Sequence, residues 1–382
     1  MIDVGISLTM DRRVDILGKG IFKDRIWPAV KQYVYSSYLT LQIWQARWDD
    51  FLHDHETNCR QKLWAHRRGF YSDRISKFGL TEANYHEFLS DFAYKKLHHI
   101  NGKYSPWIDD KLIIRYMLAP FKDYLPEYYF QVKKGQITPL PDLPPGYAAN
   151  LEGVVELLAD EGDLAFKPMA GSHGIGFYKL SSRYEKYYVN EKMVTRDALA
   201  GILNQEKEYI LTEYITSHED IRRIYSGSPN TLRFLVINPP GSELIYSNAH
   251  LRFGTSASGA VDFNTDGGLF STVNLETGKY SGCMRFMEHY AEACDVHPDS
   301  GVFIEGVLPH WESVKQVLKE ISFYLPQMKF MGYDIILTPE SFKIIEINSH
   351  PALGPQQHYS PLLRDEETSR FFADLINEKR RG

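Results

Sequence analysis

The chain has 382 residues, 43% of them hydrophobic, with a formal net charge of −6 and a pI near 6.2. This length and apolar content suffice for a large core divided over two or three domains, and the acidic balance argues against a dedicated nucleic-acid-binding protein. The three cysteines (Cys59, Cys283 and Cys294) are scattered and odd in number, so they form no disulfide framework. No apolar run approaches about eighteen residues and no signal peptide is visible, so we expect a cytoplasmic protein without membrane insertion.

Residues 24 to about 120 are predicted to be mainly helical, since long Tyr- and Trp-rich stretches are interleaved with charges. Aromatic residues at helical spacing, such as Trp44 with Trp48, are expected to form packing faces, and a groove for an extended substrate is the alternative. Thr81, followed by Asn84 and a periodic apolar run, predicts the start of a helix.

A proline-rich linker, PLPDLPPG at 139–146, separates this region from the rest of the chain, because its prolines and glycine block both helix and central strand. The elements predicted next are a helix at 151–160, strands at 163–168 and 176–180, a helix at 195–206 and a strand at 208–215. Beyond residue 230, strands and turns dominate, with a helix at 311–324 and a final hairpin of strands at 331–337 and 343–348.

The segment AFKPMAGSHGIGFYKL places Lys167 at the end of a strand, before a loop that contains Gly171, Ser172, Gly174 and Gly176. Glycines let backbone N–H groups approach phosphate oxygens closely, and a lysine supplies a compact positive charge. The spacing fits neither the P-loop nor the dinucleotide fingerprint. A phosphate-binding flap is one interpretation, and a tight hairpin is the other.

The final hairpin carries acidic groups where buried strands normally carry aliphatic ones. Alternation along KIIEIN places Ile345 and Ile347 on one face and Ile344, Glu346 and Asn348 on the other. The polar face of this strand is therefore predicted to be functional.

A turn within T-P-E-S, near Glu340, would place Asp334 directly across from Glu346. Two facing carboxylates destabilise a sheet by up to about 1 kcal/mol, and a divalent cation between them removes that penalty. Asp, Glu and Asn supply hard oxygen ligands. The set Asp334, Glu346 and Asn348 therefore predicts a magnesium or manganese site for phosphate chemistry.

Together these parts resemble the ATP-grasp superfamily, and more narrowly the sugar-transfer-associated ATP-grasp proteins found with polysaccharide genes. The likeness extends over roughly residues 80–360, and its motifs occur in the expected order: WIDDKLIIRYML, LAFKPMAGSHGIGFYKL, ILTEYITSH, NTLRFLVI, NAHLRFG, DFNTDGG and MGYDIIL…KIIEINSHPALG. The resemblance implies an α+β fold in which two α+β subdomains clamp ATP, preceded by a mainly helical N-terminal region. The domains expected are a helical region at 1–105, a pre-grasp segment at 106–148, a lid subdomain at 149–216 and a C-terminal subdomain with the metal site at 217–382.

The resemblance also implies which residues bind ATP. Lys167 would contact the α- and β-phosphates, and the loop 171–176 would close over the β- and γ-phosphates. The segment 213–215 would lie against the adenine, and His218, or one of Glu219 and Asp220, would contact the ribose. Lys111 would be a second nucleotide lysine, and the role of His173 stays open. The full set is Lys111, Lys167, Gly171, Ser172, His173, Gly174, Gly176, Glu213, Tyr214, Ile215 and His218.

Arg233 and Arg252 are the predicted catalytic residues. Each lies on an apolar strand, where a buried guanidinium requires an anionic partner. A transferring phosphoryl group, or an acyl phosphate made from it, is such a partner. A structural carboxylate such as Asp262 is the alternative.

A polar loop follows these strands and is predicted to line the acceptor or carboxylate pocket. An ordinary turn is the alternative, because Asn, Asp and Gly are what turns need. Its residues are Asp262, Asn264, Gly267 and Gly268.

The function implied is an ATP- and magnesium-dependent carboxylate–amine ligase that forms an amide-type bond through an acyl phosphate. The resemblance suggests an amino acid or related carboxylate joined to a sugar, peptide or polysaccharide precursor. The partners would be a small-molecule carboxylate and an amine or hydroxyl acceptor, without nucleic acid, and a homodimer is compatible with the many aromatic residues. A kinase that phosphorylates a hydroxyl on the same fold and a non-catalytic nucleotide-binding scaffold in polysaccharide assembly stay open as alternatives.

Overall fold

The computed structural model describes residues 27–169, 174–204, 207–262, 267–288 and 290–381. Its contacts divide the chain into two compact units. Unit 1 comprises Met1–Ser72 and Ser90–Lys96, and unit 2 comprises Asp73–Leu89 and Leu97–Gly382. Within the described ranges, none of the helices combines the length and the apolar character needed to span a bilayer.

Unit 1 is helical, as the sequence predicted. Its helices are α1 (Trp27–His53), α2 (Cys59–Arg67) and α4 (Asp91–Lys96). Leu39 and Ile43 on one face of α1 are buried against Phe92 of α4. On the same helix, the carboxylate of Asp50 lies 2.6 Å from the His66 ring of α2, and this pair links the two helices.

Unit 2 begins with short helices. They are α3 (Arg74–Phe78), η3 (Tyr85–Glu87), η4 (Gly102–Tyr104), α5 (Pro106–Asp109), α6 (Lys111–Met117) and η5 (Ala119–Tyr124). The helix start predicted at Thr81 is wrong. The Asn84 side chain accepts a hydrogen bond from the Thr81 N–H at 2.7 Å and closes a turn there, and only the single turn of η3 follows. The hydrogen bond from the backbone to the Asn84 side chain stabilises a turn here, although the spacing of the apolar residues is that of a helix.

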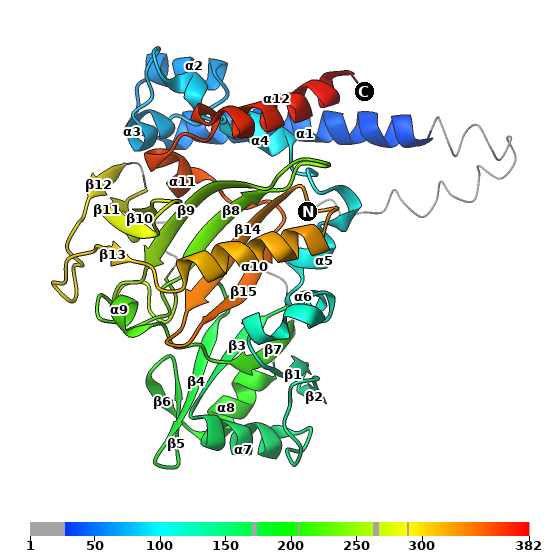
Figure 1. Ribbon diagram of the computed structural model, residues 1–382, viewed down its shortest axis with the longest axis vertical. Helices are drawn as coiled ribbons and strands as arrows, with labels where there is room; N and C mark the ends of the chain where they lie inside the picture. The colour runs from blue at the N-terminus through cyan, green and yellow to red at the C-terminus, as the bar shows by residue number, and fades with distance from the viewer. Residues whose placement is uncertain (1–26, 170–173, 205–206, 263–266, 289, 382) are drawn as a thin grey trace, which may run out of the picture. The chain divides into compact units, whose positions relative to one another are not determined.

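A seven-stranded antiparallel sheet follows, which we call the small sheet. In spatial order its strands are β2 (Gln136–Pro139), β1 (Tyr128–Lys133), β7 (Glu208–Glu213), β3 (Asp163–Pro168), β4 (Tyr178–Arg183), β5 (Lys186–Val189) and β6 (Lys192–Val194). The helices α7 (Leu151–Glu161) and α8 (Arg196–Leu203) cover one face (Figure 1). The predicted helix at 151–160 and strand at 163–168 are confirmed.

Alternation along β3 decides which face of the small sheet carries Lys167. Leu164 and Phe166 are buried in the core that α7 and α8 form with the sheet. Since side chains alternate along a strand, Lys167 lies on the opposite face, away from these two helices.

The second, eight-stranded sheet is also antiparallel, and we call it the large sheet. Its strands in order are β12 (Ala291–Ala293), β11 (Lys279–Phe286), β10 (Gly268–Val273), β9 (Ile245–Phe253), β8 (Leu232–Ile237), β14 (Phe330–Leu337) and β15 (Phe342–Asn348), with β13 (Gly306–Val307) paired to β11. The short helix α9 (Glu219–Arg222) precedes β8.

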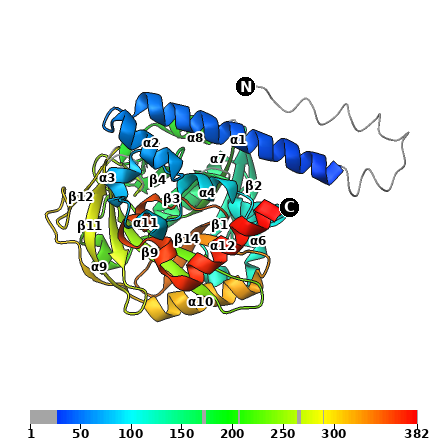
Figure 2. The same cartoon turned by 90° about the horizontal axis from the view of Figure 1, so that it is seen from above.

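Helices cover both faces of the large sheet. The helix α10 (Trp311–Tyr324) packs on one face, where Trp311 stacks 5.3 Å from Phe234. Its apolar residues recur every three or four positions, as a core-facing helix requires. The helices α11 (Gly354–Tyr359) and α12 (Glu366–Arg381), joined by η6 (Leu362–Arg364), pack on the other face, where Phe372 lies 5.6 Å from Phe330 (Figure 2).

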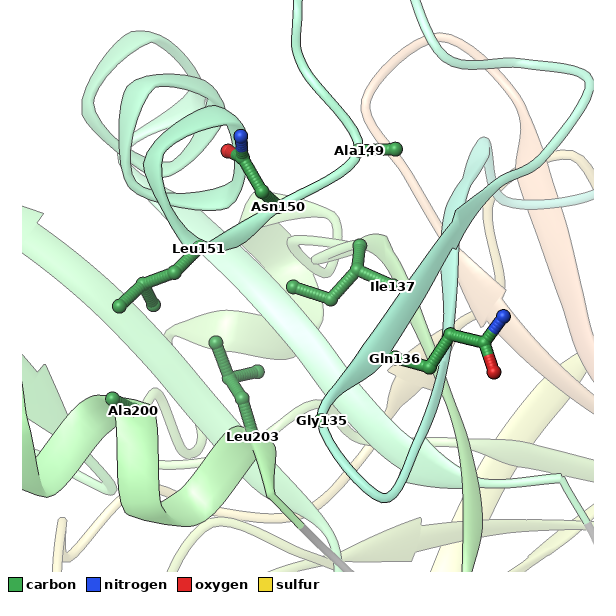
Figure 3. Close-up of a pocket in the computed structure, with 8 residues that line it drawn as sticks. All are labelled: Gly135, Gln136, Ile137, Ala149, Asn150, Leu151, Ala200 and Leu203. Carbon is green, nitrogen blue, oxygen red and sulfur yellow. The ribbon is translucent and has the colours of Figure 1, made fainter.

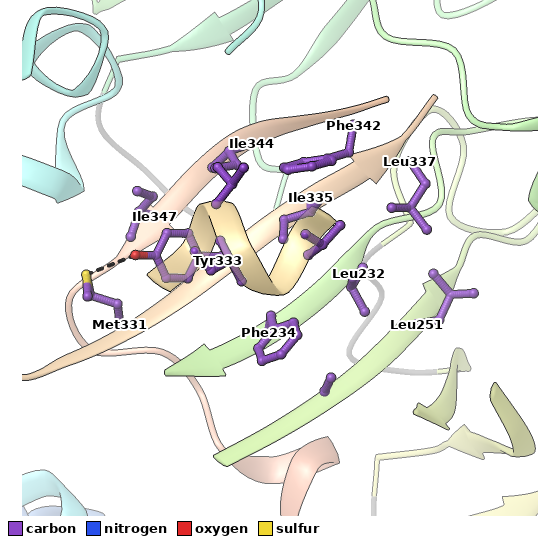
Figure 4. Packing of buried hydrophobic residues seen from close by; sticks show 14 of the residues in the cluster. Leu232, Phe234, Leu251, Met331, Tyr333, Ile335, Leu337, Phe342, Ile344 and Ile347 are labelled. Atoms are coloured by element: carbon purple, nitrogen blue, oxygen red, sulfur yellow. Dashed lines mark hydrogen bonds between the residues drawn. The ribbon is translucent and has the colours of Figure 1, made fainter. Parts of the chain in front are cut away.

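The two faces of β8, β14 and β15 differ in polarity. Figure 4 shows the apolar face, where Phe234, Tyr333 and Ile335 are fully buried. The alternate residues of the same strands form the polar face, which includes Arg233 and Asp334.

The register of the final hairpin confirms one sequence prediction and corrects another. Asp334 pairs directly with Glu346, as predicted, but Ile335 pairs with Ile344, so a β-bulge at Ile345 adds one residue to β15. The bulge turns Ile344 into the apolar core beside Ile347 (Figure 4). Ile344 therefore does not share the polar face of Glu346.

Asn101 ties the helical start of unit 2 to the large sheet. It is 2% exposed, its amide nitrogen donates to the carbonyls of Phe330 and Ser349, and its oxygen accepts from the N–H groups of Lys329 and Phe330. Asn101→Ala leaves these four backbone groups without their partner, so we expect a loss of about 4 kcal/mol or more in the free energy of unfolding, at 1–3 kcal/mol per group.

Urea denaturation measures this loss. Asn84→Ala, at a turn nearer the surface, serves as the control and should cost about 1 kcal/mol or less. Equal losses in the two variants would contradict the anchoring role of Asn101.

Candidate active site

Two arginines on the polar face of the large sheet share one carboxylate. The Nε atom of Arg233, on β8, lies 2.6 Å from Oδ1 of Asp334, on the neighbouring strand β14. From β9 on the other side, Nη2 of Arg252 lies 3.1 Å from the same oxygen. Both guanidinium groups are nearly inaccessible to solvent. One carboxylate thus balances two buried cations.

Asp262 is the second carboxylate near Arg252. It lies 3.7 Å from the Nε atom of Arg252 and accepts hydrogen bonds from the N–H and the hydroxyl of Thr231, at 2.7 and 2.5 Å. Although burial lowers the pKa of Arg252, the charges of Asp334 and Asp262 raise it overall. The structural partner expected for Arg252 is present, but Asp334 lies closer.

Glu346 and Lys111 extend this cluster along the hairpin. Lys111 opens α6, whose N-terminus is capped by the Asp110 side chain. Its Nζ lies 3.5 Å from Oε1 of Glu346, the residue that pairs with Asp334. On the same strand, the Asn348 amide nitrogen is buried without a hydrogen-bond partner among the described residues. The fold therefore brings Lys111, a predicted ATP-binding residue, to the predicted metal site.

Lys167 reaches the same region from the small sheet. Its side chain is 9% exposed, and no carboxylate in the described ranges pairs with it. Burial first, and then the charge of Lys111, lower its pKa to about 8, while Glu346 opposes the shift. A buried ammonium without a counter-ion indicates a place for an external anion.

The segment 213–218, whose first three residues are predicted to lie against the adenine, leads from the small sheet to the large one. At its start, the N–H of Glu213 donates to the carbonyl of Glu127, and at its end the N–H of His218 donates to the carbonyl of Leu337. Between them, neither Tyr214 nor Ile215 makes a backbone hydrogen bond to another described residue. The His218 ring itself accepts from an N–H in the first turn of α9.

The glycine-rich loop is only partly described. The predicted residues Gly171, Ser172 and His173 lie outside the described residues. Gly174 and Gly176 have φ values of +67° and +80°, and a Cβ on Gly176 would lie 2.7 Å from the Tyr209 hydroxyl. These two positions need glycine, which fits either a flap or a tight turn.

The polar loop before β10 is also described in part, and Asn264 lies outside the described residues. Asp262 faces the start of β8, as described above. Gly267 donates its N–H to the carbonyl of Phe286, and Gly268 begins β10.

Comparisons with known proteins place this arrangement in a family. A family model described as sugar-transfer associated ATP-grasp matches residues 94–369. The chain belongs to this family. Its fold is the ATP-grasp fold, of the α+β class, preceded by a mainly helical N-terminal region, and both sequence predictions are confirmed. No curated protein sequence matches the chain.

Solved structures show weaker likeness to this ATP-grasp protein. One is D-alanyl-alanine synthetase A from Vibrio cholerae, with 12% identity and a TM-score of 0.43 over 72% of this chain and 65% of that one. Another is the VanG D-Ala:D-Ser ligase from Enterococcus faecalis, with 15% identity and a TM-score of 0.39 over 76% and 64%. The chain spans less than two thirds of the length of either enzyme.

The residues of this ATP-grasp chain fit a magnesium ion bound together with phosphate. Across its described ranges, no group of three or more His, Cys, Asp or Glu side chains is arranged to hold a metal alone. Magnesium, however, is usually held by one or two carboxylates plus substrate phosphates and water. Asp334 and Glu346 supply two carboxylates, and rotation of the unpartnered Asn348 amide offers a third oxygen.

His250 lies beside both arginines, opposite Arg233 and two residues before Arg252, and is not among the residues predicted from the sequence. It is 2% exposed, pairs directly with Arg233 across β8 and β9, and has no hydrogen-bond partner for Nδ1 among the described residues. Burial, and then the charges of Arg252 and Arg233, lower its pKa well below the usual value, so the imidazole is neutral. The signal was present in the sequence, because alternation in A-H-L-R places His250 on the face of Arg252.

A separate cavity of about 390 Å³ lies on the helix side of the small sheet (Figure 3). Its lining comes from β2, α7, α8 and the segments beside them: Gly135, Gln136, Ile137, Ala149, Asn150, Leu151, Ala200 and Leu203. The lining contains no charged side chain, and Lys167 lies on the opposite face of the sheet. The cavity is therefore not part of the charged cluster.

Proposed function

We propose that this protein is an ATP- and magnesium-dependent ligase that joins a carboxylate to an amine through an acyl phosphate. One observation carries the proposal. Four cations (Lys111, Lys167, Arg233 and Arg252) converge with little exposure around three carboxylates, and Lys167 has no carboxylate partner among the described residues. A polyanion such as a nucleoside triphosphate would satisfy the surplus positive charge.

The nucleotide would lie between the two sheets. Lys167 and Lys111 would contact its phosphates, with the loop 171–176 closing over them. The backbone of Tyr214 and Ile215 would bind the adenine, since these groups have no other backbone partner among the described residues. His218, Glu219 or Asp220, at the start of α9, would contact the ribose.

Glu346, Asp334 and Asn348 would hold magnesium, with manganese as a substitute of the same ligand preference. When bound, the metal neutralises phosphate charge and polarises a phosphoryl oxygen. Glu346 is the better placed carboxylate, because two guanidinium groups already contact Asp334.

The reaction would proceed in two steps. An oxygen of the substrate carboxylate attacks the γ-phosphorus of ATP, and ADP leaves. An amine then attacks the acyl carbon, loses a proton and displaces inorganic phosphate. Arg252 and Arg233 would donate hydrogen bonds to the phosphoryl oxygens as charge shifts during both steps, which is the role of preorganised donors in phosphoryl and acyl transfer.

The substrates follow from the family alone. Its description as sugar-transfer associated supports a sugar or polysaccharide precursor as one substrate, and we propose that an amino acid or related carboxylate is joined to it or to a peptide. If the acceptor were a hydroxyl, the same arginines and metal ligands would stabilise its reaction with the acyl phosphate.

A coupled ADP-release screen over pairs of carboxylates and amines, with products weighed by mass spectrometry, tests this proposal. ADP together with a new amide supports ligation. ADP with a stable phosphorylated product would replace it by a kinase. Nucleotide binding without ADP from any pair would replace it by a scaffold.

The lowered pKa of Lys167 predicts a pH dependence of ATP binding. The ammonium binds phosphate only when protonated, and with a pKa of about 8 it is lost as pH rises. At pH 9 about one tenth stays charged, so the Kd of the magnesium nucleotide should rise about tenfold from its value at pH 7. Isothermal titration calorimetry at both pH values measures the change.

Lys167→Arg is the control for this measurement, since a guanidinium stays protonated over this pH range. Its Kd should change by less than about threefold between pH 7 and pH 9. The same tenfold rise in both proteins would assign the titration to another group.

A further inference from the structure

Helix α1 of unit 1 carries two apolar faces, although a surface helix normally needs one. One face is used, because Leu39 and Ile43 are buried against Phe92. The other is not, since its large side chains are each about half exposed, with exposed fractions from 47% to 58%. We call these residues the outer stripe: Tyr38, Leu41, Trp44, Trp48 and Leu52.

Leu41, Trp44 and Trp48 of the outer stripe belong to a seven-residue repeat in the sequence of α1, and Tyr38 and Leu52 flank it at the e position. Apolar residues recur at 27, 34, 41 and 48, and again three positions later at 30, 44 and 51, with Ser37 as the one polar member. This is the a and d pattern of a coiled coil over almost four heptads. Leu39 and Ile43 fall at the f and c positions, on the side away from the seam.

The charge of α1 favours a partner that is neither strongly acidic nor strongly basic. The helix carries Lys31 and Arg47 against Asp49 and Asp50, so its net charge is zero. A helix that lies on an anionic membrane has a polar face rich in Lys and Arg, which α1 lacks. A seam with a seven-residue repeat is instead complementary to a second copy of itself.

The area available is of the size that a stable dimer needs. Covering the exposed half of three aromatic side chains on each of two helices removes on the order of 450–750 Å² from water, at 150–250 Å² for a fully buried aromatic. The two leucines of the outer stripe, also about half exposed on each helix, bring the total toward the roughly 1,000 Å² expected of a specific interface.

We propose that two copies of this chain associate through α1, as a two-helix coiled coil whose seam is the outer stripe. The association involves unit 1 and none of the residues assigned to nucleotide or metal. It therefore stands or fails independently of the proposed ligase activity.

Sedimentation velocity of the full chain over a range of concentrations tests the proposal. The wild-type protein should sediment as a dimer, with twice the chain mass of 44.2 kDa. Leu41→Lys/Trp48→Lys places four ammonium groups in the seam and should weaken the dimer at least 100-fold. Gln42→Lys/Asp49→Asn, one position along the helix, changes the net charge equally and should alter the Kd by less than about threefold.

A complementary variant separates loss of the seam from loss of folding. Leu41→Glu/Trp48→Glu should also be monomeric alone, but an equimolar mixture with the lysine variant should form heterodimers through opposite charges. A mixture that stays monomeric would overturn the proposal. So would a monomeric wild-type protein, whether or not it cosediments with anionic vesicles, and so would a dimer that the lysine variant leaves intact.

Discussion

Replacing Glu346 by Gln is expected to abolish ADP release, with a fall in kcat of about 10³-fold or more. Glu346 lies directly across from Asp334 and 3.5 Å from Lys111. It is thus the carboxylate at which the predicted metal, the phosphates and the nucleotide lysine would meet. Loss of metal stabilisation of a phosphoryl transition state is worth several kcal/mol, which corresponds to this factor.

The same variant should keep its fold. Glutamine has the size of glutamate, but the change removes the ion pair with Lys111 as well as the repulsion from Asp334. Because these two effects oppose each other, we expect the Tm to fall by no more than a few degrees, together with a nucleotide affinity that no longer responds to magnesium. ADP release, thermal unfolding and nucleotide titration with and without magnesium measure the three effects.

Glu340→Gln is the matched control, since Glu340 is exposed in the turn of the same hairpin. Its turnover should stay within about twofold of the wild-type value. ADP production by Glu346→Gln at the wild-type rate would remove Glu346 from the reaction, and with it the metal site proposed at this hairpin.

The hairpin shows which structural features can be predicted from the sequence and which cannot. A period of two and a short turn are local signals, and they suffice to predict that Asp334 and Glu346 face each other. The bulge at Ile345 depends on more than the strand itself. Ile344 and Ile347 are both buried in the core, although residues three apart on a regular strand lie on opposite faces. One extra residue in the strand, the bulge at Ile345, is what allows both to be buried while Glu346 lies on the polar face.

The ion-pair partner that Arg233 and Arg252 share could not be predicted from the local sequence pattern. The sequence predicted that Arg233 and Arg252 need an anion, because guanidinium groups on apolar strands cannot be left unpaired. It did not show that both would share Asp334, a residue 101 positions after Arg233. That pairing depends on β8 lying between β9 and β14, an order of strands that follows from long-range packing.

Replacing Arg252 by Lys is the second change for which we expect a large effect. Arg252 lies within 3.1 Å of Asp334, and its Nε donates to the Thr231 hydroxyl at 2.8 Å. Lysine keeps the charge but cannot reproduce this fork of donors. If the guanidinium binds the transferring phosphoryl group, kcat should fall about 10²- to 10³-fold, while the Kd of the nucleotide changes by less than about threefold.

Stopped-flow or coupled measurement of ADP release gives kcat, and calorimetry gives the Kd. Arg222→Lys, on the exposed helix α9, is the control and should leave both unchanged. A fall in nucleotide affinity equal to the fall in kcat would place Arg252 in ground-state nucleotide binding rather than in transfer. Turnover that survives the change would show that Arg252 serves only as the counter-ion of Asp334 and Asp262. Arg233 would then be the arginine that binds the phosphoryl group, because its Nη1 is buried without a hydrogen-bond partner among the described residues.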